Sequence, residues 1–83
     1  LQFEVVIRMP QYIVEDLQTE EQVLYFSAND IKDALYLTLG ELCDRGVKKL
    51  MMDFEKVDEF HGYVGITLPF GVHYNYEVGE EGR

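Results

Sequence analysis

The groups best suited to acid–base or metal chemistry lie in one polar segment of the chain. Asp58, Glu59 and His61 fall within four consecutive positions, and His73 follows twelve residues after His61. Carboxylate and imidazole groups bind several divalent ions, and a histidine beside a glutamate can act as a general base. The spacing matches no established metal motif, and no residue pattern marks a nucleophile. We therefore expect an incidental polar turn, with a small metal-binding or catalytic domain built on His61 as an alternative.

Cys43 and three glycines are the other candidates for chemistry. One cysteine cannot form an intramolecular disulfide or a cysteine-based zinc site. We expect Cys43 to be a small buried side chain near the edge of a helix face. Gly62, Gly65 and Gly71 lack the Lys-Ser/Thr ending of a phosphate-binding loop, so we expect them in turns and in a strand. No cofactor is expected.

The acidic side chains are concentrated in two clusters. Of the net charge of −9, residues 1–27 carry −4 and residues 50–83 carry −5, whereas residues 28–49 are neutral. This charge excludes direct binding to a phosphate backbone, which requires clustered Lys and Arg. We expect a solvated surface; the sharper hypothesis is an inhibitor of phage or mobile-element type, even a nucleic-acid mimic, that meets a basic nucleic-acid-binding protein. The clusters are Glu15, Asp16, Glu20 and Glu21, and then Asp53, Glu55, Asp58 and Glu59.

Length and composition limit the class of protein. Eighty-three residues form a single domain, with residues 79–83 as a frayed polar tail, and 47% hydrophobic residues is too many for a disordered chain. No apolar run approaches the roughly 20 residues that span a membrane. A single cysteine and the lack of a signal-peptide pattern favour a reducing, cytoplasmic compartment.

Strand-like segments flank one helical segment. The sequence therefore predicts an α+β domain with a single helix packed on one largely antiparallel sheet of four to six strands, in the order of two or three strands, the helix and three strands. The strands just before and just after the helix run parallel if they share this sheet. Pro69, Phe70 and Gly71 fit a type I turn. The predicted strands are residues 2–9, 12–15, 23–26, 47–54, 63–68 and 72–78.

The clearest predicted element is a helix over residues 30–45. Ser27 or Asn29 is the expected N-cap, and two aspartates in the first turn suit the positive end of the helix dipole. Gly46 and Val47 predict a Schellman ending. The predicted apolar face contains Ile31, Ala34, Leu35, Thr38, Leu39 and Leu42.

The outer side of this helix carries residues that need an explanation. Tyr36, Leu37 and Gly40 fall away from the apolar face at about 100° per residue. Gly40 costs the helix roughly 1 kcal/mol relative to alanine. Either the strand connections cover this side, or the glycine admits a partner with Tyr36 and Leu37 as anchors. The second alternative gives our first hypothesis, a non-enzymatic module that acts through protein–protein contacts or as a homodimer, without direct contact to nucleic acid or membrane.

Overall fold

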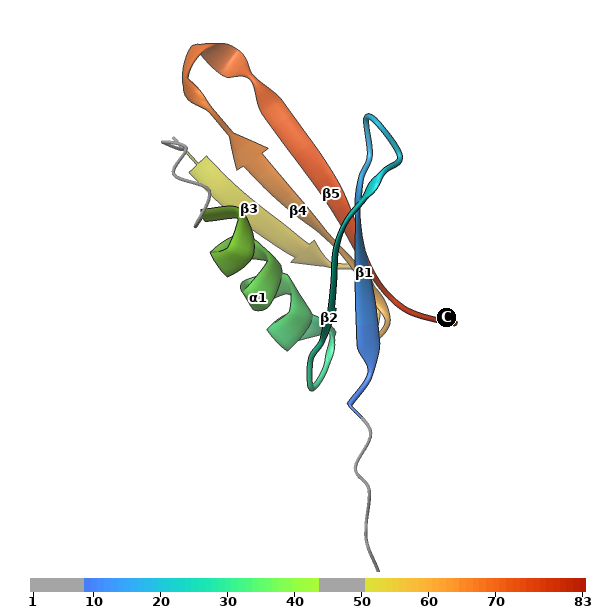
Figure 1. Ribbon diagram of the computed structural model, residues 1–83. Coiled ribbons are helices and arrows are strands. Elements are labelled where there is room, and N and C mark those ends of the chain that lie inside the picture. Colours follow the sequence, from blue (N-terminus) through green and yellow to red (C-terminus); the bar gives the residue numbers. More distant parts are fainter. Residues whose placement is uncertain (1–8, 44–50) are drawn as a thin grey trace, which may run out of the picture.

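The computed structural model describes residues 9–43 and 51–83 of the chain. Five strands and one helix follow one another in the predicted order, so the α+β class is confirmed. The helix packs on one face of a single sheet, and no helix of the described residues covers the other face (Figure 1). The elements are β1 Gln11–Asp16, β2 Gln22–Ser27, α1 Ile31–Cys43, β3 Met51–Lys56, β4 His61–Thr67 and β5 His73–Glu80, with a short 3-10 turn at Pro69–Gly71.

The sheet has the order β2-β1-β5-β4-β3, and every neighbouring pair is antiparallel. β2 and β3 therefore lie at opposite edges and point the same way, because four reversals of direction separate them. This confirms the parallel direction predicted for the two strands that flank α1. The start of β2 and the end of β3 consequently lie at opposite ends of the sheet (Figure 1).

The core lies between α1 and the sheet face that the helix covers. Tyr12, Val14, Val64 and Val78 point toward the helix and are at most 1% exposed. Because side chains alternate along a strand, their neighbours point to the opposite face, which we call the open face. The predicted apolar face of the helix is confirmed: Leu39 packs partly buried against the core, and the fully buried helix positions are Ile31, Ala34, Leu35, Thr38 and Leu42.

The N-cap of α1 is Asp30, so the prediction of Ser27 or Asn29 was wrong. The Asp30 carboxylate accepts a hydrogen bond from the Asp33 N–H at 2.8 Å. The Asp33 carboxylate accepts one in turn from the Asn29 N–H at 3.3 Å. Ser27 still belongs to β2, where its hydroxyl bonds the side chain of Gln11 on β1. Asp30 thus satisfies one of the N–H groups that the first helical turn leaves without partners, and Asp33 ties the residue before the N-cap to the same turn.

β5 continues further than predicted, so residues 79 and 80 are not part of a frayed tail. Gly79 lies opposite Ile13 of β1 and His61 of β4. The Glu81 N–H then donates to the main-chain oxygen of Gln11 at 2.7 Å. β5 is the central strand, and pairing on both sides holds these residues in spite of their polar side chains.

The connection between β4 and β5 is not the predicted type I turn. Phe70 has φ +70° and Gly71 has φ +78°, whereas both central residues of a type I turn have negative φ. The Leu68 N–H donates to the Val72 carbonyl at 2.8 Å and closes a three-residue connection. A phenylalanine in the left-handed region is uncommon, and this ring is fully exposed at the hairpin tip.

Some predictions lie outside the described residues. These are residues 2–8 of the strand predicted over residues 2–9, the helix end at Gly46 and Val47, and the start of the strand over residues 47–54. The burial of Cys43 also lies outside what is described. The described part of the strand predicted over residues 47–54 is β3, which ends at Lys56, two residues beyond the predicted end.

Candidate protein-interaction surface

The outer side of α1 is exposed, as a docking role for it requires. The side chains of Tyr36 and Leu37 are 52% and 43% exposed. Apart from the residues next to Gly40 and the backbone of its own helix, no atom of the described chain lies within 4 Å of the position that a Cβ on Gly40 would take. The three residues do not form one surface, however, because Tyr36 faces β3 and Leu37 faces β2. The helical wheel predicts a single docking surface, but the structure has two separate ones, one beside β3 and one beside β2.

The first of these surfaces joins α1 to β3. The Tyr36 ring meets the Phe54 ring edge-on, with centroids 5.0 Å apart and an interplanar angle of 62°. Phe54 is 39% exposed, and Met52, two positions earlier on the same side of the strand, is 43% exposed. Their cross-strand partners on β4 are Val64 and Ile66, which are core residues. We call Tyr36, Met52 and Phe54 the Tyr36 surface.

The Tyr36 surface is exposed because of where β3 lies in the sheet. β3 is the last strand on its side, and no further strand of the described residues pairs with it. All six of its residues, Met51–Lys56, are exposed. The alternation of apolar and polar residues in this segment predicts a strand but not its place in the sheet. From the sequence alone, Met52 and Phe54 cannot be told apart from core residues. An edge strand with exposed apolar side chains offers both main-chain hydrogen bonds and an apolar surface.

The second surface is a groove between α1 and β2. Leu37 and Glu41 form its helical wall, and Leu24, Tyr25, Phe26 and Ser27 form the wall on the strand. Leu24 and Phe26 are already partly buried against the core. This groove is therefore the flank of the existing core, whereas the Tyr36 surface extends beyond it.

The open face of the sheet is strongly acidic. Glu15, Glu77, Tyr63 and Glu55 lie opposite one another in a single row across β1, β5, β4 and β3. Neighbouring strands are about 4.8 Å apart, so Glu15 and Glu77 place like charges side by side. The lysines and arginines of the described residues are Lys32 on α1, Lys56 on the helix side of β3, and Arg83. None of these lies in this row.

Only the turn members of the two acidic clusters lie at opposite ends of the sheet, Glu20 and Glu21 between β1 and β2 and Asp58 and Glu59 between β3 and β4. In the first cluster, Asp16 has a structural role, because its carboxylate accepts the Gln18 N–H at 2.8 Å and so helps to form the β1–β2 turn. In the second cluster, Glu59 lies beside the N-terminal end of α1, where Asp30, Lys32 and Lys56 line the same hollow. The row on the open face connects Glu15 of the first cluster with Glu55 of the second.

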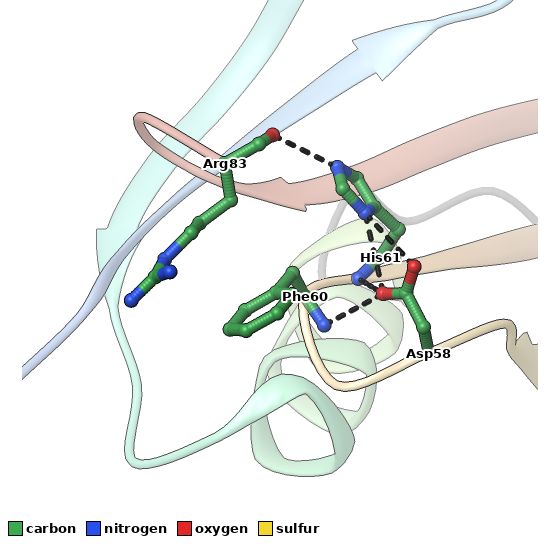
Figure 2. A network of polar contacts seen from close by, with 4 residues as sticks. All are labelled: Asp58, Phe60, His61 and Arg83. Carbon is green, nitrogen blue, oxygen red and sulfur yellow. Dashed lines mark hydrogen bonds and ion pairs between the residues drawn. The ribbon is translucent and has the colours of Figure 1, made fainter.

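His61 lies in a hydrogen-bond network that fastens the end of the chain to the β3–β4 turn (Figure 2). Its Nδ1 is 3.2 Å from the Asp58 carboxylate, and its Nε2 is 3.1 Å from the main-chain oxygen of Arg83. The Asp58 carboxylate also accepts the N–H groups of Phe60 at 2.7 Å and His61 at 2.8 Å. The Arg83 guanidinium lies 4.6 Å from the centre of the Phe60 ring. Both imidazole nitrogens are engaged, so the network supports a structural role.

The electrostatics of this turn follow from the same contacts. The Phe60 N–H, followed by the N–H and the ring of His61, lowers the pKa of Asp58 below its ordinary value. His73 is not part of the group, because it pairs with Thr67 at the far end of β4 from His61. His61 and Thr67 are six positions apart along β4, or roughly 20 Å. The described residues contain no cluster of three potential metal ligands.

The chain has no significant match to a protein-family model, a curated protein or a solved structure. Among the described residues, no helix is long and apolar enough to cross a membrane. The physical properties of the surface are therefore the basis for assigning a function.

Proposed function

We propose that this chain is a non-enzymatic protein-interaction module that binds its partner along β3 and the Tyr36 surface. The observation that carries the proposal is the coincidence of an edge strand, all six residues of which are exposed, with the exposed Tyr36 ring of α1 beside it. The lone cysteine is compatible with a cytoplasmic setting.

The two features of this surface suit one mode of recognition. A partner segment in extended conformation can add to an open sheet edge through main-chain hydrogen bonds. Specificity then comes from side chains that fit beside those of the edge strand. Tyr36 and Phe54 are large rings, the kind of residue that carries most of the energy in protein interfaces. Leu37, the other predicted anchor, and Gly40, the residue predicted to admit the partner, are not part of this surface.

The test is a pull-down from an extract of the cells that naturally contain the chain. The baits are the wild-type chain, a Tyr36→Ser/Phe54→Ser variant and a matched Tyr25→Ser/Leu37→Ser variant, which removes two exposed apolar side chains near β2. We expect a partner that the wild type and the β2-side control retain and that the β3-side variant loses. Equal retention by all three baits would place the interaction elsewhere on the chain.

The acidic row on the open face favours a second candidate function, inhibition of a basic nucleic-acid-binding protein. Glu15, Glu77 and Glu55 line up across the open face, with Tyr63 between the last two, and a mimic of a phosphate backbone needs carboxylates spaced along a surface in this way. This function predicts that a bound partner is released by competing double-stranded DNA. It also predicts that Glu15→Gln/Glu77→Gln weakens binding more than Tyr36→Ser/Phe54→Ser does.

A further inference from the structure

We propose that the occupant of the β3 edge is an extended segment of a partner protein in which Lys or Arg alternates with apolar residues. This inference rests on the proposed function and specifies the chemistry of the partner. It follows from what the two sides of β3 would offer to a strand added beside it.

On the open face, an added strand would lie next to two carboxylates. Asp53 and Glu55 alternate with Met52 and Phe54, so both acids point to this side. A neighbouring strand lies about 4.8 Å away, which brings its side chains on this face beside Asp53 and Glu55. Opposite charges in such cross-strand positions stabilise the pairing, and like charges oppose it. A segment with cations at alternate positions therefore fits this side.

The structure also has room for a cationic head group at this point. Gly65 has no side chain, and the Asp53 carboxylate folds over it from β3. Asp53, Glu55, Tyr63 and Asn75 line a hollow of about 200 Å³ there. No lysine or arginine of the described residues lines this hollow or lies in the row of Glu55. The hollow is thus polar, acidic and next to the open edge.

On the helix side, the same strand would meet apolar groups. Met52 and Phe54 point toward α1, and Tyr36 packs on Phe54. Apolar residues at the alternate positions of the added strand would cover these exposed side chains. The partner segment is therefore two-sided, with cations toward the open face and apolar side chains toward Tyr36.

A second copy of this chain is a poor occupant of the edge. Two copies of β3 can pair antiparallel about a twofold axis only in registers that keep helix-side residues opposite helix-side residues. The two registers with the greatest overlap of Met51–Lys56 place Asp53 opposite either Asp53 or Glu55 of the second copy. Like charges directly opposite each other destabilise a strand pair. The same acids that attract a basic segment thus oppose a homodimer through β3.

The test uses three synthetic eight-residue peptides in which valine alternates with lysine, threonine or glutamate. Backbone amide shifts of the intact chain, followed by NMR during titration, locate the binding and give its affinity. We expect the lysine peptide to perturb β3 and not β2, and to bind roughly tenfold more tightly than the threonine peptide at low ionic strength. The glutamate peptide should be the weakest.

Two charge-removing variants separate the explanations. Asp53→Asn/Glu55→Gln should abolish the preference for lysine and leave the threonine peptide unaffected. Glu15→Gln/Glu20→Gln removes the same charge from β1 and the β1–β2 turn, with β5 and β4 between them and β3, and should retain the preference. Equal affinity for lysine and threonine peptides at β3 would overturn the inference but leave strand addition intact. Failure of every peptide to perturb β3 would overturn both. A dimer at micromolar concentration in sedimentation experiments, disrupted by Phe54→Ser, would also contradict the inference.

Discussion

The two edge strands, β2 and β3, differ in how many of their side chains pack against the core. β2 is bound to the rest of the molecule through its side chains: Leu24 and Phe26 pack against the core, and the Phe26 ring lies 6.5 Å from that of buried Tyr12. β3 is bound through its backbone, and each of its six side chains is exposed. Phe54 has a ring partner too, but that partner, Tyr36, is itself 52% exposed.

This contrast distinguishes structural apolar residues from those free to bind. Both strands present apolar side chains toward the helix side, so composition alone does not separate them. At β2, removal of an apolar side chain takes contacts from the core. At β3, it takes them from a surface, and the fold loses little. The contrast therefore predicts opposite effects on stability and on partner binding for the two edges.

The largest expected effect comes from truncating one phenylalanine on each edge. We expect Phe26→Ala to lower the free energy of unfolding by about 3 kcal/mol, the low end for a buried phenylalanine, because Phe26 is partly buried. Phe54→Ala should cost about 1 kcal/mol, mainly the ring contact with Tyr36. Urea denaturation measures both. Equal losses would mean that β3 is as much a part of the core as β2, and the docking proposal would lose its basis.

A smaller effect is expected where β3 is attached to β4. A Cβ on Gly62 would lie 2.7 Å from the Glu55 main-chain oxygen and 2.9 Å from the Leu35 side chain. Gly62→Ala should therefore destabilise the fold by about 2 kcal/mol through overpacking. Thermal unfolding gives the size of the effect, and amide shifts of β3 show where the structure adjusts. Unchanged stability would mean that β3 can move away from β4 at no cost.

The sequence predicts the elements well because their signals are local. The three-four spacing of Ile31, Leu35 and Leu42 fixes the buried side of α1, and the alternation of Val64 and Ile66 fixes that of β4. Strand order is not local. Met52 and Phe54 alternate in the same way as core residues, and only the sheet order places them at an edge.

The candidate surface could therefore be predicted only in part. Tyr36 stands out on the helical wheel, but its partner Phe54 is eighteen positions away and comes close only through the fold. Gly40 stands out equally and lies against nothing in the described chain. The acidic row was also hidden, because Glu15, Glu77 and Glu55 come from three strands whose register no local pattern specifies.

Gly40 offers a milder test, because it lies on the helix between the two edges. With open space around its Cβ position, Gly40→Ala should raise the free energy of unfolding by about 1 kcal/mol through helix propensity alone. Partner binding at β3 should not change, since Gly40 lies outside the Tyr36 surface. Chemical denaturation and a binding titration are the two measurements. A loss of binding would restore the sequence-based hypothesis that the glycine admits the partner.

The smallest expected effect is a pH-dependent change in stability, and it concerns the segments that follow the two edge strands. β2 leads into the aspartate caps of α1, whereas β3 ends in a turn that the Asp58 carboxylate holds. The N–H of Phe60, with His61, lowers the pKa of Asp58 in the folded chain. The ionised carboxylate therefore stabilises the fold above the unfolded-state value of about 3.9, and this contribution is lost as the pH falls through the lower folded-state value. Asp58→Asn should be less stable than the wild type at pH 7, with a difference that disappears on acidification.

Glu59→Gln provides the control for this prediction, since it removes the same charge from the same turn. A pH series of urea denaturation curves for the three proteins separates the specific contacts of Asp58 from the general acidity of the cluster. If Glu59→Gln showed the same pH-dependent loss, the turn after β3 would be held by net charge. If only Asp58→Asn showed it, the β3 turn would be locked by the Phe60 and His61 contacts. The exposure of β3 would then be a property of a well-fixed strand, which is the condition for an edge that a partner can extend.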